Sequence, residues 1–139
     1  MASGFTTEWM NDILGELFGG VAMAAPGTLY FGLCTGVTAG GTITGEPSGN
    51  GYSRKNMTND SALWNTPAAG LVDNKVAITF PQASGSWGTI THFFIANAAS
   101  GGGTAVICYG QLTLSKAIDN GDTPSFGIGD LDIQLQATA

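Results

Sequence analysis

The first part of the chain carries apolar residues at the spacing of an α-helix. Between residues 7 and 18, Trp9, Ile13 and Leu17 recur every four positions. Met10, Leu14 and Phe18 form a neighbouring stripe that widens the same apolar face. A helix of this length is marginal in isolation, so its apolar face must pack on something. Packing on the chain's own β-domain and anchoring to a neighbouring subunit both fit the pattern.

After residue 27 the apolar positions alternate with polar or small ones, which predicts β-strands. Bulky apolar residues on both faces of residues 90–97 predict a central strand that is buried on both sides. The predicted strands are 28–33, 52–58, 76–80, 90–97, 105–114, 125–128 and 131–135. Short strands joined by Gly-rich turns are typical of a sandwich or jelly roll. We therefore predict an all-β, jelly-roll-like β-sandwich over residues 26–139, preceded by a helical arm over residues 1–25.

Composition adds information about the surface. Charged residues make up 10% of the chain against about 25% in a typical domain. A surface so poor in charge is expected where partners cover it. The Gly- and Thr-rich loop 36–50 is the first candidate contact segment. Arg54 and Lys55 are two further candidates, which would either meet acidic groups of a partner or form a solvated strand face.

Charge and cysteine usage exclude several classes of protein. The net charge is −6 with four basic residues, which argues against nucleic-acid binding and against an anionic membrane surface. Cys34 and Cys108 show no metal-binding spacing, and a single disulfide between them remains open. We read the N-terminus as lacking a signal peptide, which favours synthesis in a reducing cytoplasm.

No set of residues indicates catalysis. His92 is expected to be structural, because no nucleophile and acid accompany it and no second histidine could share a metal. Acidic residues 119, 122, 130 and 132 fit solvated turns better than a calcium loop. The tryptophans and tyrosines fit core positions better than an exposed sugar-binding platform. We expect no enzyme activity, no cofactor and no bound metal.

A set of motifs in a fixed order resembles a known family. The motifs are Phe18-Gly19-Gly20, Thr28-Leu29-Tyr30-Phe31-Gly32-Leu33, Gly51-Tyr52-Ser53-Arg54, Ile78-Thr79-Phe80-Pro81, Trp87-Gly88-Thr89-Ile90-Thr91-His92-Phe93, Leu112-Thr113-Leu114-Ser115-Lys116, Gly121-Asp122-Thr123 and Gly129-Asp130-Leu131. The chain resembles small virion proteins of tailed bacteriophages, often labelled tail fiber proteins. It is also similar to the jelly-roll cement proteins that decorate some capsids.

The resemblance implies a virion protein made in the host bacterial cytoplasm. Our first expectation is a capsid decoration protein that forms a dimer or trimer and contacts other virion proteins such as the major capsid protein. The alternative is a tail fiber or tail-tip component that binds host surface glycans. Trp9, Ile13, Leu17, Arg54 and Lys55 are the expected interface residues, together with the loop 36–50.

Overall fold

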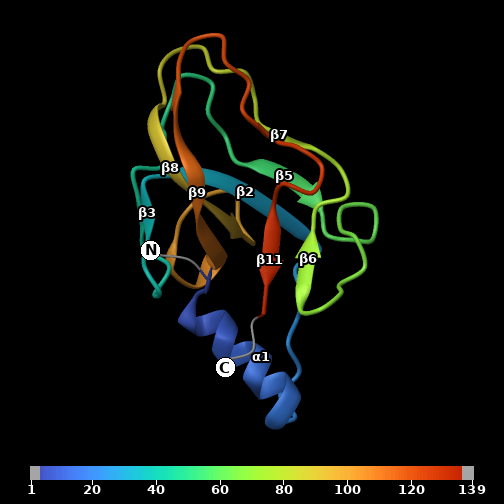
Figure 1. The fold of residues 1–139 in the computed structure, drawn as a ribbon. Helices are drawn as coiled ribbons and strands as arrows, with labels where there is room; N and C mark the ends of the chain where they lie inside the picture. Colours follow the sequence, from blue (N-terminus) through green and yellow to red (C-terminus); the bar gives the residue numbers. More distant parts are fainter. Residues whose placement is uncertain (1–3, 136–139) are drawn as a thin grey trace.

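The computed structural model describes residues 4–135. A helix, α1 (Thr7–Phe18), lies at one end of a β-body and points away from it (Figure 1). The strands are β1 (Gly4–Phe5), β2 (Thr28–Cys34), β3 (Gly36–Val37), β4 (Ile43–Thr44), β5 (Lys55–Thr58), β6 (Leu71–Asp73), β7 (Ile78–Thr79), β8 (Gly88–Ala96), β9 (Val106–Ile118), β10 (Ser125–Phe126) and β11 (Asp132–Gln134). The helix has the bounds that the sequence predicted.

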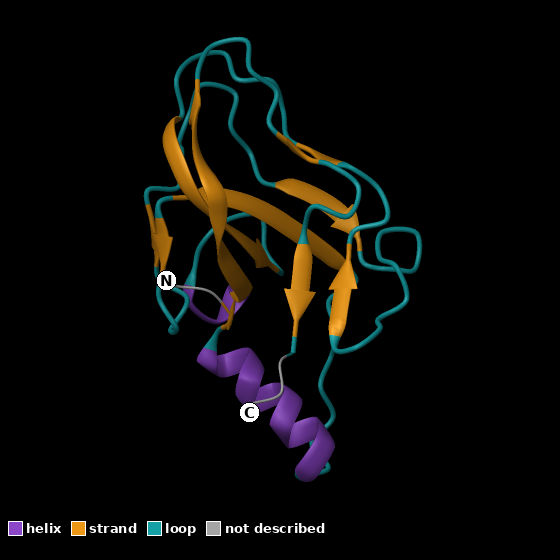
Figure 2. Cartoon of the chain, viewed as in Figure 1, coloured by secondary structure: helices purple, strands orange, loops and turns teal. Residues whose placement is uncertain are grey.

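The main sheet has five antiparallel strands in the order β1-β9-β8-β2-β5. Two short pairs, β10-β7 and β11-β6, lie on one side of it, and the hairpin β3-β4 forms a further pair (Figure 2). The strands form layers without closing into a barrel, which confirms the predicted all-β sandwich class. The division into an arm and a β-domain stays a prediction.

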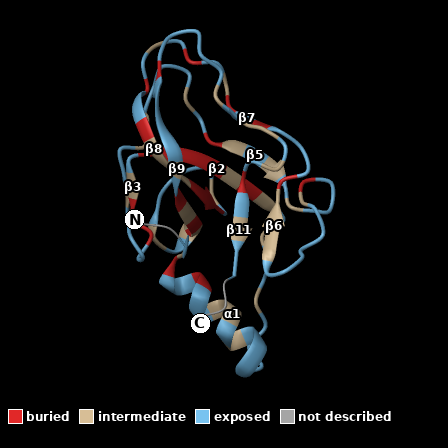
Figure 3. Ribbon diagram, viewed as in Figure 1, coloured by how far each residue is buried: buried red, intermediate tan, exposed pale blue. Residues whose placement is uncertain are grey.

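The main core fills the space between the large sheet and the short strand pairs. Phe31 and Ile95 of the sheet and Ile78 of β7 are fully buried there (Figure 3). Phe126 from β10 closes the layer, with its ring 5.5 Å from that of Phe93 in an edge-to-face arrangement. Such pairs add about 0.5–1.5 kcal/mol beyond the burial of area.

A second, smaller cluster covers the opposite face of β2 and β8. Phe94 is its centre, together with Cys34, Val37 and Ala96. The ring of Phe94 lies directly over Gly32, where a Cβ atom would come within 2.1 Å of a ring carbon. Phe94 faces this cluster, whereas its neighbours Phe93 and Ile95 face the main core. The strand β8 is therefore buried on both sides. The prediction of a central strand is therefore confirmed.

Three local predictions need correction. The loop 36–50 contains the hairpin β3-β4, and β9 runs further than the predicted end at residue 114. The predicted strand 76–80 shortens to Ile78–Thr79, with Val76 exposed. Asn74 explains the last difference, because its buried side-chain amide donates to the carbonyls of Val76 and Gly127 at 2.8 Å and fixes a turn there. Within residues 4–135 no helix is long and apolar enough to cross a membrane.

Candidate interaction surfaces

The start of α1 is fixed firmly to the β-body. Trp9 is 8% exposed, and its indole Nε1 donates to the Thr104 carbonyl at 3.0 Å. Thr6 precedes the helix, and its hydroxyl donates to the Val106 carbonyl at 2.6 Å instead of capping the helix. Thr6 therefore fixes the start of the helix to β9, and Trp9 fixes its first turn to the short 3-10 helix Gly103–Ala105 just before β9.

The rest of α1 presents apolar side chains to solvent. Leu14, Leu17 and Phe18 are 54%, 67% and 83% exposed, and Val21 beyond the helix is similarly open. Figure 3 shows this as a pale blue helix end that follows a partly buried beginning. Of the three predicted helix contacts, Trp9 therefore packs inside its own chain, Ile13 is half-buried and Leu17 faces water. Sequence reasoning placed Leu14 and Phe18 on the same apolar face but did not select them as interface residues.

An apolar groove runs between the helix and the β-body. It has a volume of about 520 Å³ and is lined by Trp9, Ile13, Leu29, Trp64, Ile95 and further side chains of the same kind. Trp64 is half-buried there, and its ring lies 6.2 Å from that of Phe31. From α1, Trp9 and Ile13 line the groove, whereas the exposed Leu14, Leu17 and Phe18 do not.

Arg54 is bonded inside its own chain, and its expected contact with a partner stays a prediction. It is 7% exposed, and its Nε and Nη2 atoms donate to the two carboxylate oxygens of Glu46, each at 2.8 Å. Its Nη1 and Nη2 atoms also donate to the carbonyls of Ala98 and Gly101, and the guanidinium lies 4.7 Å above the Phe94 ring. A bidentate pair of this kind is strong and directional. The charge of Arg54 is thus already neutralised within the chain.

Tyr52 completes this network on the carboxylate side. Its hydroxyl donates to Glu46 at 2.8 Å and accepts the Leu33 backbone N–H at 3.2 Å. Burial raises the pKa of the Tyr52 hydroxyl well above its usual range, so the group stays a donor. The network ties the loop 36–50 to the main sheet. Lys55, the neighbouring candidate, is half-buried at the edge strand β5.

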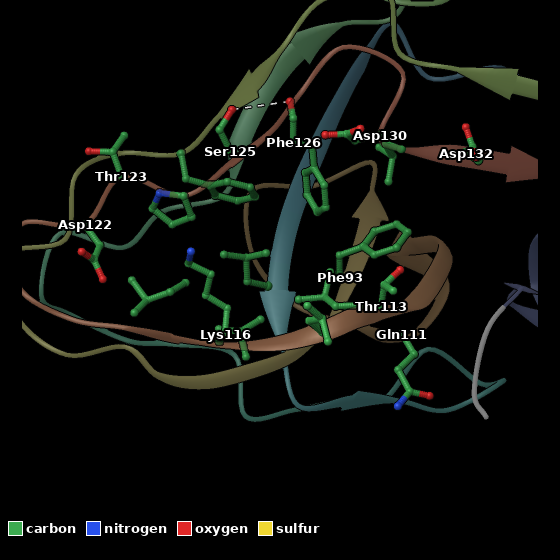
Figure 4. A pocket seen from close by; sticks show the side chains of 18 residues that line it. Phe93, Gln111, Thr113, Lys116, Asp122, Thr123, Ser125, Phe126, Asp130 and Asp132 are labelled. Carbon is green, nitrogen blue, oxygen red and sulfur yellow. Dashed lines mark hydrogen bonds between the residues drawn. The ribbon is translucent and has the colours of Figure 1, made fainter.

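A second hollow, the edge cleft, opens along β9. Its volume is about 800 Å³, and its walls come from β9 on one side and residues 122–132 on the other. Figure 4 shows Phe93 and Phe126 inside it, with Lys116 and Asp122 at one end and Gln111 at the other. Asp130 and Asp132 lie on the wall opposite β9. The cleft therefore combines an aromatic interior with charged rims.

The remaining candidate residues lie in strands and turns. His92 lies in β8, with Nδ1 2.8 Å from the Thr91 hydroxyl. The Asp122 carboxylate accepts the Asp119 backbone N–H at 2.9 Å, as expected of a turn. Cys34 and Cys108 are buried free thiols, which answers the open question of a disulfide. No group of metal-ligating side chains occurs among the described residues.

The chain matches the model of a known protein family. A family model described as Podophage GP4 fiber I protein gp80 matches residues 4–134. No curated protein matches the chain. The match extends from β1 to the end of β11 and so covers both the helix and the β-body. The predicted resemblance to tailed-phage virion proteins is confirmed, because the chain belongs to the family of the podophage GP4 fiber I protein gp80, a family of phage virion proteins.

Proposed function

We propose that the protein is a structural subunit of the phage fiber that catalyses no reaction. It assembles with copies of itself and with other virion proteins, and it is made in the cytoplasm of the host bacterium. The observation that carries this proposal is the exposed apolar end of α1. Large apolar patches on a soluble protein mark interaction surfaces.

Burial of this apolar surface would contribute several kcal/mol to a contact between subunits. Full burial of one large aliphatic or aromatic side chain contributes about 1.5–3 kcal/mol. The exposed fractions of Met10, Leu14, Leu17, Phe18 and Val21 together amount to roughly three such side chains, or about 5–9 kcal/mol before the costs of association. Repetition of one contact along an assembly multiplies this gain.

The fiber location has better support than the capsid decoration that the sequence first favoured. The matching family is described as a fiber protein, and that description names no capsid. The low charge and the exposed apolar helix suit either location, because both require contacts between subunits. Binding of host glycans by the fiber has no comparable support, because Trp9 and Trp87 are buried and Trp64 is half-buried.

Sedimentation equilibrium of the purified chain tests the proposal. The native protein should form a dimer or trimer at micromolar concentration. The double variant Leu17→Ser with Phe18→Ser should weaken association at least tenfold, which corresponds to about 1.4 kcal/mol. Ile128→Ser is the matched control, because Ile128 is 70% exposed but remote in sequence from α1. A native protein that stays monomeric, or a double variant that associates like the control, would contradict the proposal.

A further inference from the structure

We propose that the exposed end of α1 of one copy of this chain inserts into the apolar groove of a second copy. This inference rests on the proposed self-assembly and names the surface that receives the helix end. The donor surface is formed by Leu14, Leu17 and Phe18. The acceptor is the groove between α1 and the β-body, which has a volume of about 520 Å³.

The helix end and the groove do not meet within one chain. From α1, Trp9 and Ile13 line the groove, and beyond them the helix points away from the β-body (Figure 1). Phe18, at the far end of the helix, is 83% exposed. Within residues 4–135, each chain therefore carries an apolar projection and, separately, an apolar hollow that its own projection does not fill.

Polar side chains at the groove form hydrogen bonds within the chain. The Asn59 side chain donates to the Pro26 carbonyl at 2.8 Å and accepts the Trp64 indole N–H at 3.0 Å. The single carboxylate of the lining, that of Asp60, accepts the Ala62 backbone N–H at 2.9 Å. Such a lining suits apolar side chains better than a saccharide, many of whose hydroxyl groups would be left without partners.

The shape of the groove suits side chains that project. Leu17 and Phe18 lie in the last turn of α1, and most of the surface of each is exposed. A fully buried side chain typically touches about 6–12 other residues, and the walls of a groove supply more of these contacts than a flat surface does. Hollows of about 300–1,000 Å³ accept drug-sized ligands, so this groove can hold several side chains.

Charge favours the groove over the edge cleft as the acceptor. The last turn of α1 has no basic residue, and its free carbonyl groups give this end of the helix a partial negative charge. The lining of the edge cleft contains three aspartates and one lysine, which is unfavourable for a negative helix end. Beside the groove, Lys75 places its Nζ atom 3.5 Å from the carbonyl oxygen of Ser61, a lining residue. The groove therefore offers a cation close to an apolar interior.

Cross-linking between two variants of the full-length protein tests the inference. Phe18→Cys labels the helix end, and Thr66→Cys labels an exposed position in the lining of the groove. Mixed in equal amounts under mild oxidation, the two variants should form a disulfide-linked heterodimer. Leu114→Cys, an exposed position in the lining of the edge cleft, is the control and should link to Phe18→Cys with a several-fold lower yield. The native thiols are buried and should not compete.

Complementation between variants provides a second readout. Ala25→Glu adds a carboxylate to the lining of the groove and should weaken self-association about tenfold or more. Ala99→Glu, at an exposed alanine outside the groove, is the matched control and should associate like the native protein. A mixture of Ala25→Glu with the Leu17→Ser, Phe18→Ser variant should form a 1:1 complex at concentrations where neither associates alone. The first variant retains the helix end and the second retains the groove, so misfolding of either one would prevent this rescue.

The outcomes separate this inference from the proposed function. Dominant Phe18→Cys homodimers would show that helix ends pack on each other, and would overturn the inference while leaving self-assembly intact. Ala25→Glu that associates like Ala99→Glu, or a mixture that stays monomeric, would also overturn it, even if Leu17→Ser with Phe18→Ser still weakens assembly. A native protein that neither associates nor cross-links would contradict both proposals.

Discussion

Replacement of Arg54 by methionine should destabilise the isolated subunit strongly. The substitution keeps an unbranched side chain of similar length and removes the charge. Glu46 would then remain a largely buried carboxylate with Tyr52 as its side-chain donor, and the carbonyls of Ala98 and Gly101 would lose their donor. Removal of one partner from a buried ion pair costs about 3–5 kcal/mol. Domains of this kind have a total stability of about 5–15 kcal/mol, so the loss would be a large share of it.

Urea unfolding, followed by tryptophan fluorescence, measures this loss. The midpoint should fall while the slope of the transition stays unchanged, because the surface exposed on unfolding is similar. The measurement is best made in the Leu17→Ser, Phe18→Ser background, since association would otherwise add to the apparent stability. Lys55→Met is the control. It removes a neighbouring charge that is half-buried and should change stability by about 0.5 kcal/mol or less.

A double-mutant cycle assigns the effect to the ion pair. Glu46→Gln alone should cost about 1–3 kcal/mol, because it leaves the buried guanidinium without its counter-charge. The double variant with Arg54→Met should cost less than the sum by about 1–3 kcal/mol. If Arg54→Met costs no more than Lys55→Met and instead weakens assembly, then Arg54 serves a partner contact, and the reasoning from its internal ion pair is refuted.

Two further predictions concern the core. Gly32→Ala should destabilise the fold by about 1–3 kcal/mol or more in urea unfolding, because the added Cβ would come within 2.1 Å of the Phe94 ring. Gly27→Ala should be nearly neutral, because no atom lies within 4 Å of the position of its Cβ. Equal effects of the two substitutions on stability would contradict the packing of Phe94 on Gly32. Burial raises the pKa of Cys34 to about 11 and that of Cys108 to about 12. Both thiols should therefore resist alkylation by iodoacetamide at pH 8 until the protein is unfolded. Rapid alkylation of the native protein would contradict their burial.

The sequence predicted the elements whose signals are local. The helix follows from a stripe of apolar residues that Gly19 ends, and β8 follows from bulk on both of its faces. The predictions of the helix and of β8 depend on the spacing and size of side chains within one segment. The spacing and size can be read from the sequence without knowing the tertiary contacts.

The contacts that the sequence could not predict join distant segments. The internal role of Arg54 depends on Glu46, eight positions earlier, and on carbonyls more than 40 positions later. The turn that shortens the strand 76–80 depends on Asn74, whose amide binds a carbonyl in another loop. None of these partners leaves a periodic signal in the chain.

Cryo-electron microscopy of the intact phage particle would locate the subunit and show what covers α1. We expect density for this chain in the fiber, with Leu14, Leu17 and Phe18 packed against another protein chain and excluded from water. A reconstruction that places the subunit in the fiber with this helix face open to solvent, or that finds it outside the fiber, would contradict the proposed function.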